Sequence, residues 1–417
     1  MHGCRDTRIN RRRSLHVANR RPVVPLRSRR SPLSRQGGRA LVMLLAASLA
    51  LAGPAGAAPR GNGDEALRNR LRELVNRPDG PPGAIAVLRD GGRVRVIQAG
   101  VAEVGTRREP RATDHMRLAS ASKAYSGAVA LRLVDRGLLG LDDTIARRLP
   151  ALPAVWGDVT LRQLLHHTSG LPDYSAAPEF VDLIRADPHR VFDSRHLLDF
   201  VADQDLEFAP GSRYHYSNSD NIAVALMTEA VTGQRYEDLL ASKVFRPLGL
   251  AHTSLPAGYR LPNPYLHGYD VEPGSPPQDV STLFGASGAW ASGGMVATPA
   301  DFNTFMAGYA GGKLISEATR KQQRSFIAGA SEPAGPGTNR AGLGIFAYKT
   351  RCGVVYGHTG NTAGYTQFGA GTPDGRRSVT LSITSQVNQE NTPDLLGHLR
   401  DVEEDFVCAL LGSPSKP

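Results

Sequence analysis

Strand patterns occupy only the two ends of this sequence, and the long segment between them carries helical signals. Near the start, residues 83–88 are followed by the turn Asp90-Gly91-Gly92 and by valines that alternate with arginines at 93–96. Strand patterns return after about residue 340, over residues 354–356, 365–370 and 379–383. Antiparallel strands from both ends of a chain can share one sheet if the segment between them folds as an insert.

Helical patterns predict what surrounds this sheet. Apolar residues spaced by three and four predict long helices over 66–76, Ser120–Gly137 and 393–410. Between residues 141 and 283, proline interrupts several shorter helical stretches and no alternating pattern occurs. The predicted fold is α+β. Residues 59–140 and 284–417 form an α/β lobe, with an antiparallel sheet flanked by helices, and residues 141–283 form an inserted all-helical lobe.

The first 58 residues are typical of an export signal. They hold twelve arginines and one aspartate, then the apolar run Ala40–Ala52, then Ala55-Gly56-Ala57. A basic segment, an apolar segment and an A-x-A cleavage site compose a secretory signal peptide. The apolar run is shorter than the roughly 20 residues of a membrane-spanning helix, so we expect a secreted protein without a stable membrane anchor. The arginine pair in Ser28–Leu33 keeps the twin-arginine route open.

This signal segment also accounts for the basic charge. The whole chain carries a formal charge of +10 and the first 58 residues carry +11, which leaves −1 for residues 59–417. Nothing in the remaining composition favours a nucleic-acid partner. Two cysteines, Cys352 and Cys408, follow the signal. In an exported protein they are expected to form a disulfide, worth about 4 kcal/mol in the chain-entropy model; the alternative is two buried free thiols.

Three short motifs follow one another along the chain, and the first is Ser120-x-x-Lys123. Ser120 opens a predicted helix, and Lys123 lies one turn later on the same face. A desolvated lysine can lose its proton and then accept one from a serine. The same spacing recurs at Ser413–Lys416 in a proline-broken tail, so spacing alone proves nothing. Taken singly, the motif equally fits a helix cap and a solvated lysine.

The second motif, Tyr216-Ser217-Asn218, lies on a predicted loop before a helix that begins near Asn221. A tyrosine near a lysine ammonium can become a phenolate and carry the proton of the serine. The amide of Asn218 suits a substrate carbonyl. A buried tyrosine beside a capping asparagine is the alternative.

The third motif, His358-Thr359-Gly360, ends a predicted strand. Gly360 would let substrate approach the strand edge, and the N–H groups of Asn361 and Ser120 would form an oxyanion hole. His358 would polarise the tyrosine or meet a substrate carboxylate; judged alone, it would be a surface histidine.

Two neighbouring histidines, His166 and His167, are expected to be structural, because no further ligand is spaced for zinc. We therefore expect neither a metal nor a cofactor. The chain also lacks a G-x-S-x-G elbow, which disfavours an α/β-hydrolase.

Together the motifs resemble the serine β-lactamase and penicillin-binding-protein family, in the branch of class C β-lactamases and D-alanyl-D-alanine carboxypeptidases. The resemblance spans residues 66–410 and includes the flanking strings Leu118–Lys123, Leu161–Leu171, Tyr214–Asn221 and Tyr356–Gly360. Residues 352–356 and 374–379 are most similar to secreted DD-peptidases of Streptomyces. The resemblance implies a β-lactamase/transpeptidase-like fold and the disulfide.

Site roles follow from the same resemblance. It implies that Ser120 is the nucleophile, Lys123 and Tyr216 transfer its proton, Asn218 contacts substrate, and His358 and Thr359 lie at the substrate carboxylate. One departure stands out: Phe346 replaces the arginine that binds the carboxylate in those peptidases. Lys349 and Arg351 are the candidates to replace it, and Asn361 stands where the family has a hydroxyl residue.

The sequence thus predicts a monomeric, exported, cofactor-free serine hydrolase whose partner is a small molecule or peptide. The first choice of activity is D-alanyl-D-alanine carboxypeptidase on peptidoglycan stem peptides. An esterase, lactonase or D-amino-acid amidase comes second, and a β-lactamase third. A non-catalytic peptidoglycan-binding protein comes last, because all three motifs are intact.

Overall fold

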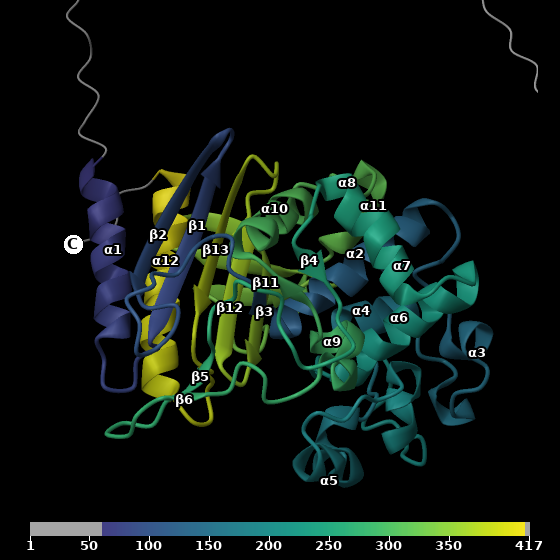
Figure 1. The fold of residues 1–417 in the computed structure, drawn as a ribbon. Helices are drawn as coiled ribbons and strands as arrows, with labels where there is room; N and C mark the ends of the chain where they lie inside the picture. The colour runs from purple at the N-terminus through teal and green to yellow at the C-terminus, as the bar shows by residue number, and fades with distance from the viewer. Residues whose placement is uncertain (1–60, 413–417) are drawn as a thin grey trace, which may run out of the picture. The chain divides into compact units, whose positions relative to one another are not determined.

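One antiparallel sheet of eight strands organises the computed structural model, which describes residues 61–412 (Figure 1). The predicted signal peptide and the second Ser-x-x-Lys sequence lie outside the described residues. The strand order is β2-β1-β13-β12-β11-β10-β9-β8. The N-terminal strands are β1 (Gly83–Asp90) and β2 (Arg93–Gly100). The others come from the C-terminal part of the chain: β8 (Ile327–Ala328), β9 (Thr338–Ala341), β10 (Phe346–Thr350), β11 (Gly353–Thr362), β12 (Tyr365–Gly371) and β13 (Arg377–Ile383).

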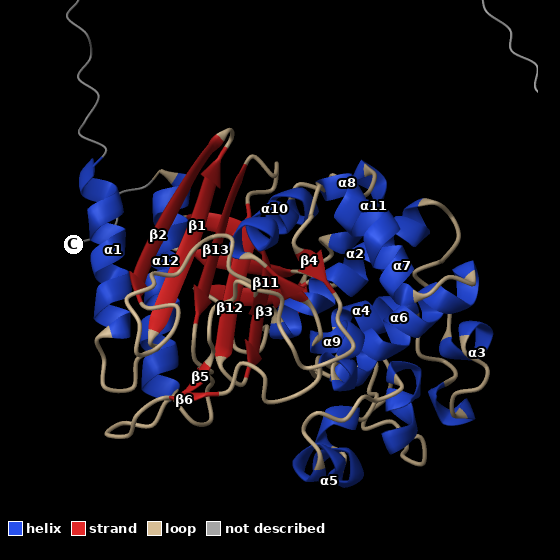
Figure 2. Cartoon of the chain, viewed as in Figure 1, coloured by secondary structure: helices blue, strands red, loops and turns tan. Residues whose placement is uncertain are grey.

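Strands from both ends of the chain share one sheet, as predicted. β1 pairs with β13, and Ala84 lies opposite Ile383. Both faces of β1 are buried, because its side chains alternate between two cores. Ala84, Ala86 and Leu88 face the core under α1 (Gly61–Val75) and α12 (Pro393–Leu411). Ile85 faces the second core, and α10 (Pro299–Ala310) covers that side of the sheet. Figure 2 shows this layering of helix, sheet and helix.

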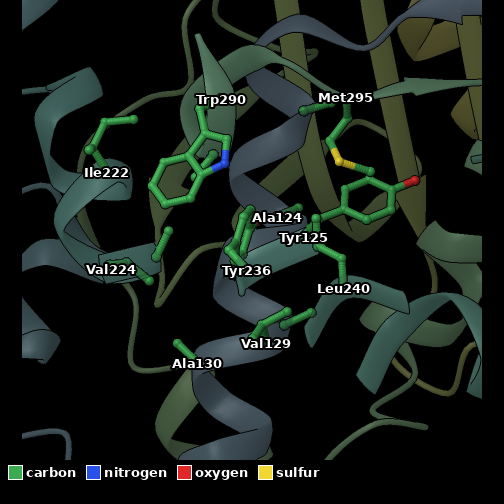
Figure 3. Packing of buried hydrophobic residues seen from close by; sticks show 14 of the residues in the cluster. Ala124, Tyr125, Val129, Ala130, Ile222, Val224, Tyr236, Leu240, Trp290 and Met295 are labelled. Atoms are coloured by element: carbon green, nitrogen blue, oxygen red, sulfur yellow. The ribbon is translucent and has the colours of Figure 1, made fainter. Parts of the chain in front are cut away.

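The second core centres on α2 (Ser122–Asp135), which is buried on all sides over its first ten residues. Apolar side chains of α6 (Asn218–Thr232), α7 (Tyr236–Leu240) and α9 (Trp290–Gly293) surround it (Figure 3). Each large side chain buried here contributes about 1.5–3 kcal/mol, so α2 is held firmly in place. The smaller helices are α3 (Ile145–Arg148), α4 (Leu161–His166), α5 (Pro178–Ala186), α8 (Arg246–Leu248) and α11 (Glu317–Gln323).

The expectation that residues 141–283 contain no strand is wrong in detail. This segment includes β4 (Thr253–Ser254), β5 (Tyr269–Asp270) and β6 (Gln278–Asp279). β4 joins β7 (Val296–Ala297) and β3 (Met116–Arg117) in a small second sheet. Strands of two residues are too short to show an alternating pattern, which is why the sequence does not reveal them. The division into two lobes stays a prediction.

The predicted disulfide between Cys352 and Cys408 is present, with a Cα–Cα distance of 5.2 Å. It ties the turn between β10 and β11 to the last turns of α12. Beside it, Arg351 forms ion pairs with Glu404 and Asp405 of the same helix. Over residues 61–412 no helix is long and apolar enough to cross a membrane, and no group of three or more His, Cys, Asp or Glu side chains is arranged to hold a metal.

Candidate active site

Ser120 lies in a short 3-10 turn, Ala119–Ala121, directly before α2. Ala119 adopts a left-handed backbone conformation, with φ of 49°, which is costly for a residue with a Cβ and is typical of functional sites. Strand β11 lies directly against this turn at Gly360. A Cβ there would stand 2.2 Å from the carbonyl oxygen of Leu118 and 3.2 Å from the nitrogen of Ser120. Gly360 therefore makes room for the turn that carries Ser120, not for substrate as the sequence suggested.

Lys123 is 1% exposed, and its Nζ has three neighbours. It lies 2.7 Å from Asn218 Oδ1, 2.8 Å from the carbonyl oxygen of Ser292 and 3.3 Å from Ser120 Oγ. Burial lowers the pKa of Lys123 to about 7, against the raising effect of the carboxylates of Asp173, Glu332 and Asp220. A neutral amine can donate to two of these acceptors and keep its lone pair for the proton of Ser120. Lys123 is thus placed and tuned to act as a base near neutral pH.

Tyr216 lies beside this pair, with its ring centroid 4.8 Å from Lys123 Nζ. Burial raises the pKa of its phenol well above 10, although a hydrogen-bonding influence of Ser120 acts in the opposite direction. The hydroxyl itself is buried and has no partner at full hydrogen-bond geometry. The expectation of a phenolate is therefore not met in this arrangement. Tyr216 is a neutral phenol, which suits it to donate a proton.

Asn218 lies between the amine of Lys123 and the carboxylate of Asp173 and bonds to both. Its Oδ1 accepts from Lys123, and its Nδ2 donates to Asp173 Oδ2 and Ser175 Oγ, each at 3.0 Å. Both ends of the amide are engaged by protein groups, so Asn218 orients Lys123 here and would have to exchange a partner to bind substrate. The sequence did not indicate Asp173, Ser175 or Ser292, because no short motif contains them.

His358 and Thr359 are enclosed by the protein. His358 is fully buried, with Nδ1 2.6 Å from the carbonyl oxygen of Thr359, and burial lowers its pKa to about 3, so the ring is neutral. This burial rules out the alternative interpretation of His358 as a surface histidine. Thr359 donates its hydroxyl to the carbonyl oxygen of Pro333 at 2.7 Å. Neither side chain lines the two cavities that border Ser120, so neither offers a carboxylate contact there in this arrangement.

The last residues of β11 have a free edge, and this edge faces Ser120. β10 pairs only with Gly353–Gly357, which leaves the following residues of β11 without a neighbour on that side. N–H groups along an antiparallel strand alternate between its two sides. Only two residues separate Thr362 from Tyr365, and the pair that closes such a hairpin exchanges its backbone hydrogen bonds, so the N–H of Thr362 points to β12 and that of Asn361 points to the free edge. The N–H groups of Asn361 and Ser120 remain the predicted donors of an oxyanion hole.

Two cavities meet at Ser120, and Asn218 and Asn361 border both. The first has a volume of about 270 Å³ and apolar walls that include Phe180, Ile184 and Phe284. We call it the apolar cavity.

The second has a volume of about 650 Å³ and contains Tyr216, Glu332 and Glu390. We call it the acidic cavity. Among the described residues that line the two cavities, none is lysine or arginine. Arg351, one candidate to bind a carboxylate, is paired with α12 instead.

The Ala/Gly/Pro-rich stretch 329–337 forms a wall of the acidic cavity. It is fixed from several sides. Tyr348 Oη donates to Ser331 Oγ at 3.1 Å, and Arg400 donates to the carbonyl oxygens of Gly335 and Gly337 at 3.0 and 2.7 Å. Composition predicts a loop here, but it does not reveal contacts with partners so far away in the sequence.

The family model described as beta-lactamase matches residues 67–403 of this chain. The chain belongs to the beta-lactamase family. Its members include serine hydrolases with carboxypeptidase, aminopeptidase and amidase activities.

A D-stereospecific amidohydrolase from Streptomyces sp. superimposes on this beta-lactamase family member with a TM-score of 0.70, at 27% identity, over 84% of this chain and 99% of the other. The predicted β-lactamase/transpeptidase-like fold is thereby confirmed.

Two curated relatives match part of the sequence. The putative D-alanyl-D-alanine carboxypeptidase of Escherichia coli K12 is 34% identical over 160 residues, 36% of this chain and 35% of that protein. The D-aminopeptidase of Brucella anthropi is 33% identical over 193 residues, 46% of this chain and 36% of that protein. The chain thus aligns with about a third of the length of these relatives.

Proposed function

We propose that this protein forms an acyl-enzyme on Ser120 and hydrolyses amides or esters whose leaving group carries no carboxylate. The observation that carries the proposal is the lining of the acidic cavity, which presents Glu332 and Glu390 and no lysine or arginine. The best candidate activity is that of a D-amino-acid amidase or esterase, which the sequence placed second. We further propose that it is secreted and monomeric.

The chemistry needs no group beyond those already described. Neutral Lys123 takes the proton of Ser120 as Oγ attacks the substrate carbonyl, and the carbonyl oxygen enters the oxyanion hole. Tyr216 donates its proton to the departing nitrogen or oxygen and is reprotonated from Lys123. Water then attacks the ester of Ser120, which releases the acid and restores the serine.

The position of Tyr216 supports an assignment of the two cavities. A proton donor for the leaving group must border the space that the leaving group occupies, and Tyr216 lines only the acidic cavity. The acyl part then occupies the apolar cavity, which suits an aromatic or branched side chain. The names of the Streptomyces D-stereospecific amidohydrolase and the Brucella D-aminopeptidase support D-configured acyl groups.

Charge argues against a carboxypeptidase, the first choice from the sequence. Its leaving group is an amino acid with a free carboxylate, which would enter a cavity that contains two glutamates. Each like charge near the surface costs on the order of 1 kcal/mol, and no lysine or arginine lines the cavity to bind the carboxylate. The name of the Escherichia coli relative keeps carboxypeptidase as the second candidate.

A matched pair of dipeptides distinguishes the two activities. D-phenylalanyl-D-alanine and D-phenylalanyl-D-alaninamide differ only in the charge of the leaving group. We expect kcat/KM to favour the amide by about tenfold, since 1.4 kcal/mol corresponds to a factor of ten. Glu332→Gln and Glu390→Gln should each reduce this preference. Glu272→Gln is the control and should not, because Glu272 is exposed and lines neither cavity. A preference of the wild type for the free acid would favour a carboxypeptidase and overturn this proposal.

A further inference from the structure

His167 occupies a backbone conformation that its residue type disfavours. It follows the last residue of α4 with φ of 55° and ψ of 47°, in the left-handed region, where helices usually place glycine or asparagine. It is also 4% exposed, so its ring is enclosed by protein. A buried histidine in a disfavoured backbone conformation indicates that its side chain has a specific role.

Three contacts connect His167 with the loop that carries Tyr216. Its carbonyl oxygen accepts a hydrogen bond of 2.8 Å from the N–H of His215. Its ring lies against the ring of Tyr216, with centroids 4.5 Å apart and planes inclined by 31°. Its Nδ1 is 3.5 Å from the nitrogen of Ser217. The contacts therefore involve Tyr216 and the residues on either side of it.

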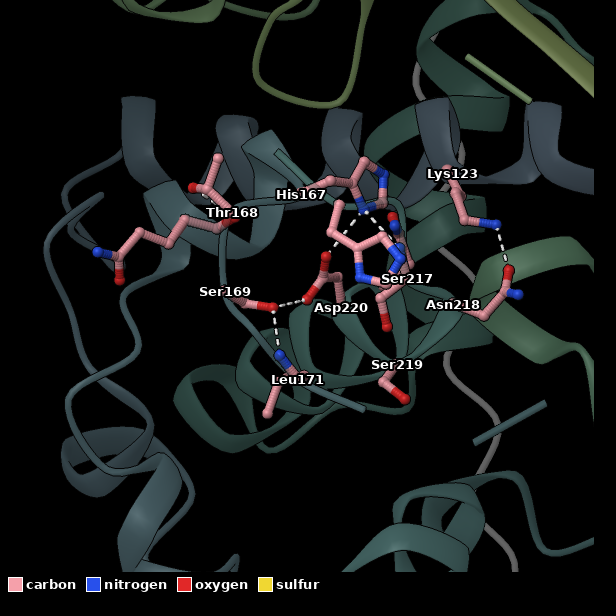
Figure 4. Close-up of polar contacts among 12 residues, drawn as sticks. Lys123, His167, Thr168, Ser169, Leu171, Ser217, Asn218, Ser219 and Asp220 are labelled. Carbon is pink, nitrogen blue, oxygen red and sulfur yellow. Dashed lines mark hydrogen bonds and ion pairs between the residues drawn. The ribbon is translucent and has the colours of Figure 1, made fainter. Parts of the chain in front are cut away.

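A buried network fixes the ring of His167 in turn (Figure 4). Its Nδ1 lies 2.8 Å from Asp220 Oδ2. The other carboxylate oxygen accepts a hydrogen bond from Ser169, whose Oγ accepts from the N–H of Leu171 at 2.9 Å. The backbone N–H can only donate, so the hydroxyl proton of Ser169 must point to Asp220. Ser169 thus fixes one oxygen of the Asp220 carboxyl group, and the other oxygen contacts the ring of His167.

The hydroxyl end of Tyr216 has no comparable restraint, because its oxygen has no partner at hydrogen-bond geometry. The direction of the phenol must then be set by contacts with its ring and backbone. We infer that His167, held by Asp220 and Ser169, is a positioning residue that aims the phenol of Tyr216 at the leaving group. The inference rests on the proposed acyl-Ser120 chemistry, in which Tyr216 is the proton donor.

Leaving-group chemistry tests this role. D-phenylalaninamide needs a proton on its departing nitrogen, and the 4-nitrophenyl ester of D-phenylalanine releases a stable anion that needs none. His167→Asn removes the ring and tolerates the left-handed backbone. We expect His167→Asn and Tyr216→Phe each to lower kcat/KM on the amide by about 10–100-fold, since a misplaced group costs on that order. Both should affect the ester much less.

A double-mutant cycle and a neighbouring histidine separate positioning from folding. In the Tyr216→Phe background, His167→Asn should cost less than about threefold more, because coupled residues are not additive. His166→Ala is the matched control: His166 is also buried, but it bonds to the carbonyl oxygen of Ser325 at 2.9 Å instead. It should keep the wild-type ratio of amide to ester rates. His167→Ala, as a second variant, should give the same signature as His167→Asn.

Several results would overturn the inference. One is an equal loss of kcat/KM on amide and ester in His167→Asn. Another is a full additional loss when His167→Asn is added to Tyr216→Phe. The third is a normal amide rate in Tyr216→Phe. Ser120→Ala separates the two proposals. Activity retained in Ser120→Ala overturns the proposed function and this inference with it. An inactive Ser120→Ala alongside a missing His167 signature overturns the inference alone.

Discussion

Replacing Lys123 by methionine should change how stability depends on pH. Burial lowers the pKa of Lys123 to about 7, whereas an unfolded lysine titrates near 10.4. Between these two values the unfolded chain binds one more proton than the folded chain, so the wild type gains about 1.4 kcal/mol of stability per pH unit. Below pH 7 both states bind the proton and this contribution is flat. Lys123→Met lacks it altogether.

Urea unfolding of the wild type and Lys123→Met at pH 6, 7, 8 and 9 measures this effect. The wild type should gain about 2.3 kcal/mol over the variant between pH 7 and 9, because the folded lysine is already half deprotonated at pH 7. The comparison cancels the titration of groups that Lys123 does not influence. The unpaired oxygens of Asn218 and Ser292 in the variant cost the same at every pH. If the unfolding free energies of wild type and variant changed in parallel from pH 6 to 9, the lowered pKa of Lys123 would be refuted.

Three further predictions follow from the same geometry. The kcat/KM for amide hydrolysis should rise tenfold per pH unit below about pH 7 and level off above it, as the Lys123 amine loses its proton; a pH-independent rate from 5 to 9 would contradict this. Gly360→Ala should abolish activity and lower the melting temperature, because its Cβ would meet the Leu118 carbonyl oxygen at 2.2 Å; activity assays and thermal unfolding decide. Cys352→Ser with Cys408→Ser should lower the unfolding free energy by about 4 kcal/mol for a separation of 56 residues, measured in urea.

The fold was predictable to the extent that its elements are long and periodic. The hairpin of β1 and β2, the strands β11 to β13 and the helices α1, α2 and α12 all show their pattern in the sequence. The two-residue strands β4 to β6 do not. The disulfide could be expected from the cysteine count, because export leaves few alternatives for two thiols.

The site was predictable in its residue types but not in its contacts. The order of Ser120, Lys123 and Tyr216 indicates the chemistry, since few other residue sets can transfer a proton this way. Burial decides the rest, and the sequence does not show it. It keeps Tyr216 a phenol and encloses His358 in neutral form.

Contacts between distant segments were also beyond the sequence. Asp173 meets Asn218 across 45 residues, and the wall formed by 329–337 rests on Arg400. The lining of the acidic cavity, which moves the proposed activity from carboxypeptidase to amidase or esterase, depends on segments brought together only by folding.

The central claim is that Ser120 becomes acylated, and intact mass spectrometry tests it most directly. Purified residues 59–417 are mixed with the 4-nitrophenyl ester of D-phenylalanine, quenched in acid after milliseconds to seconds, and digested to locate the adduct. The account predicts a D-phenylalanyl group on the peptide that contains Ser120, absent in Ser120→Ala and unchanged in Ser413→Ala, which alters the other Ser-x-x-Lys sequence. An adduct on another residue, or turnover by Ser120→Ala at the wild-type rate, would contradict it.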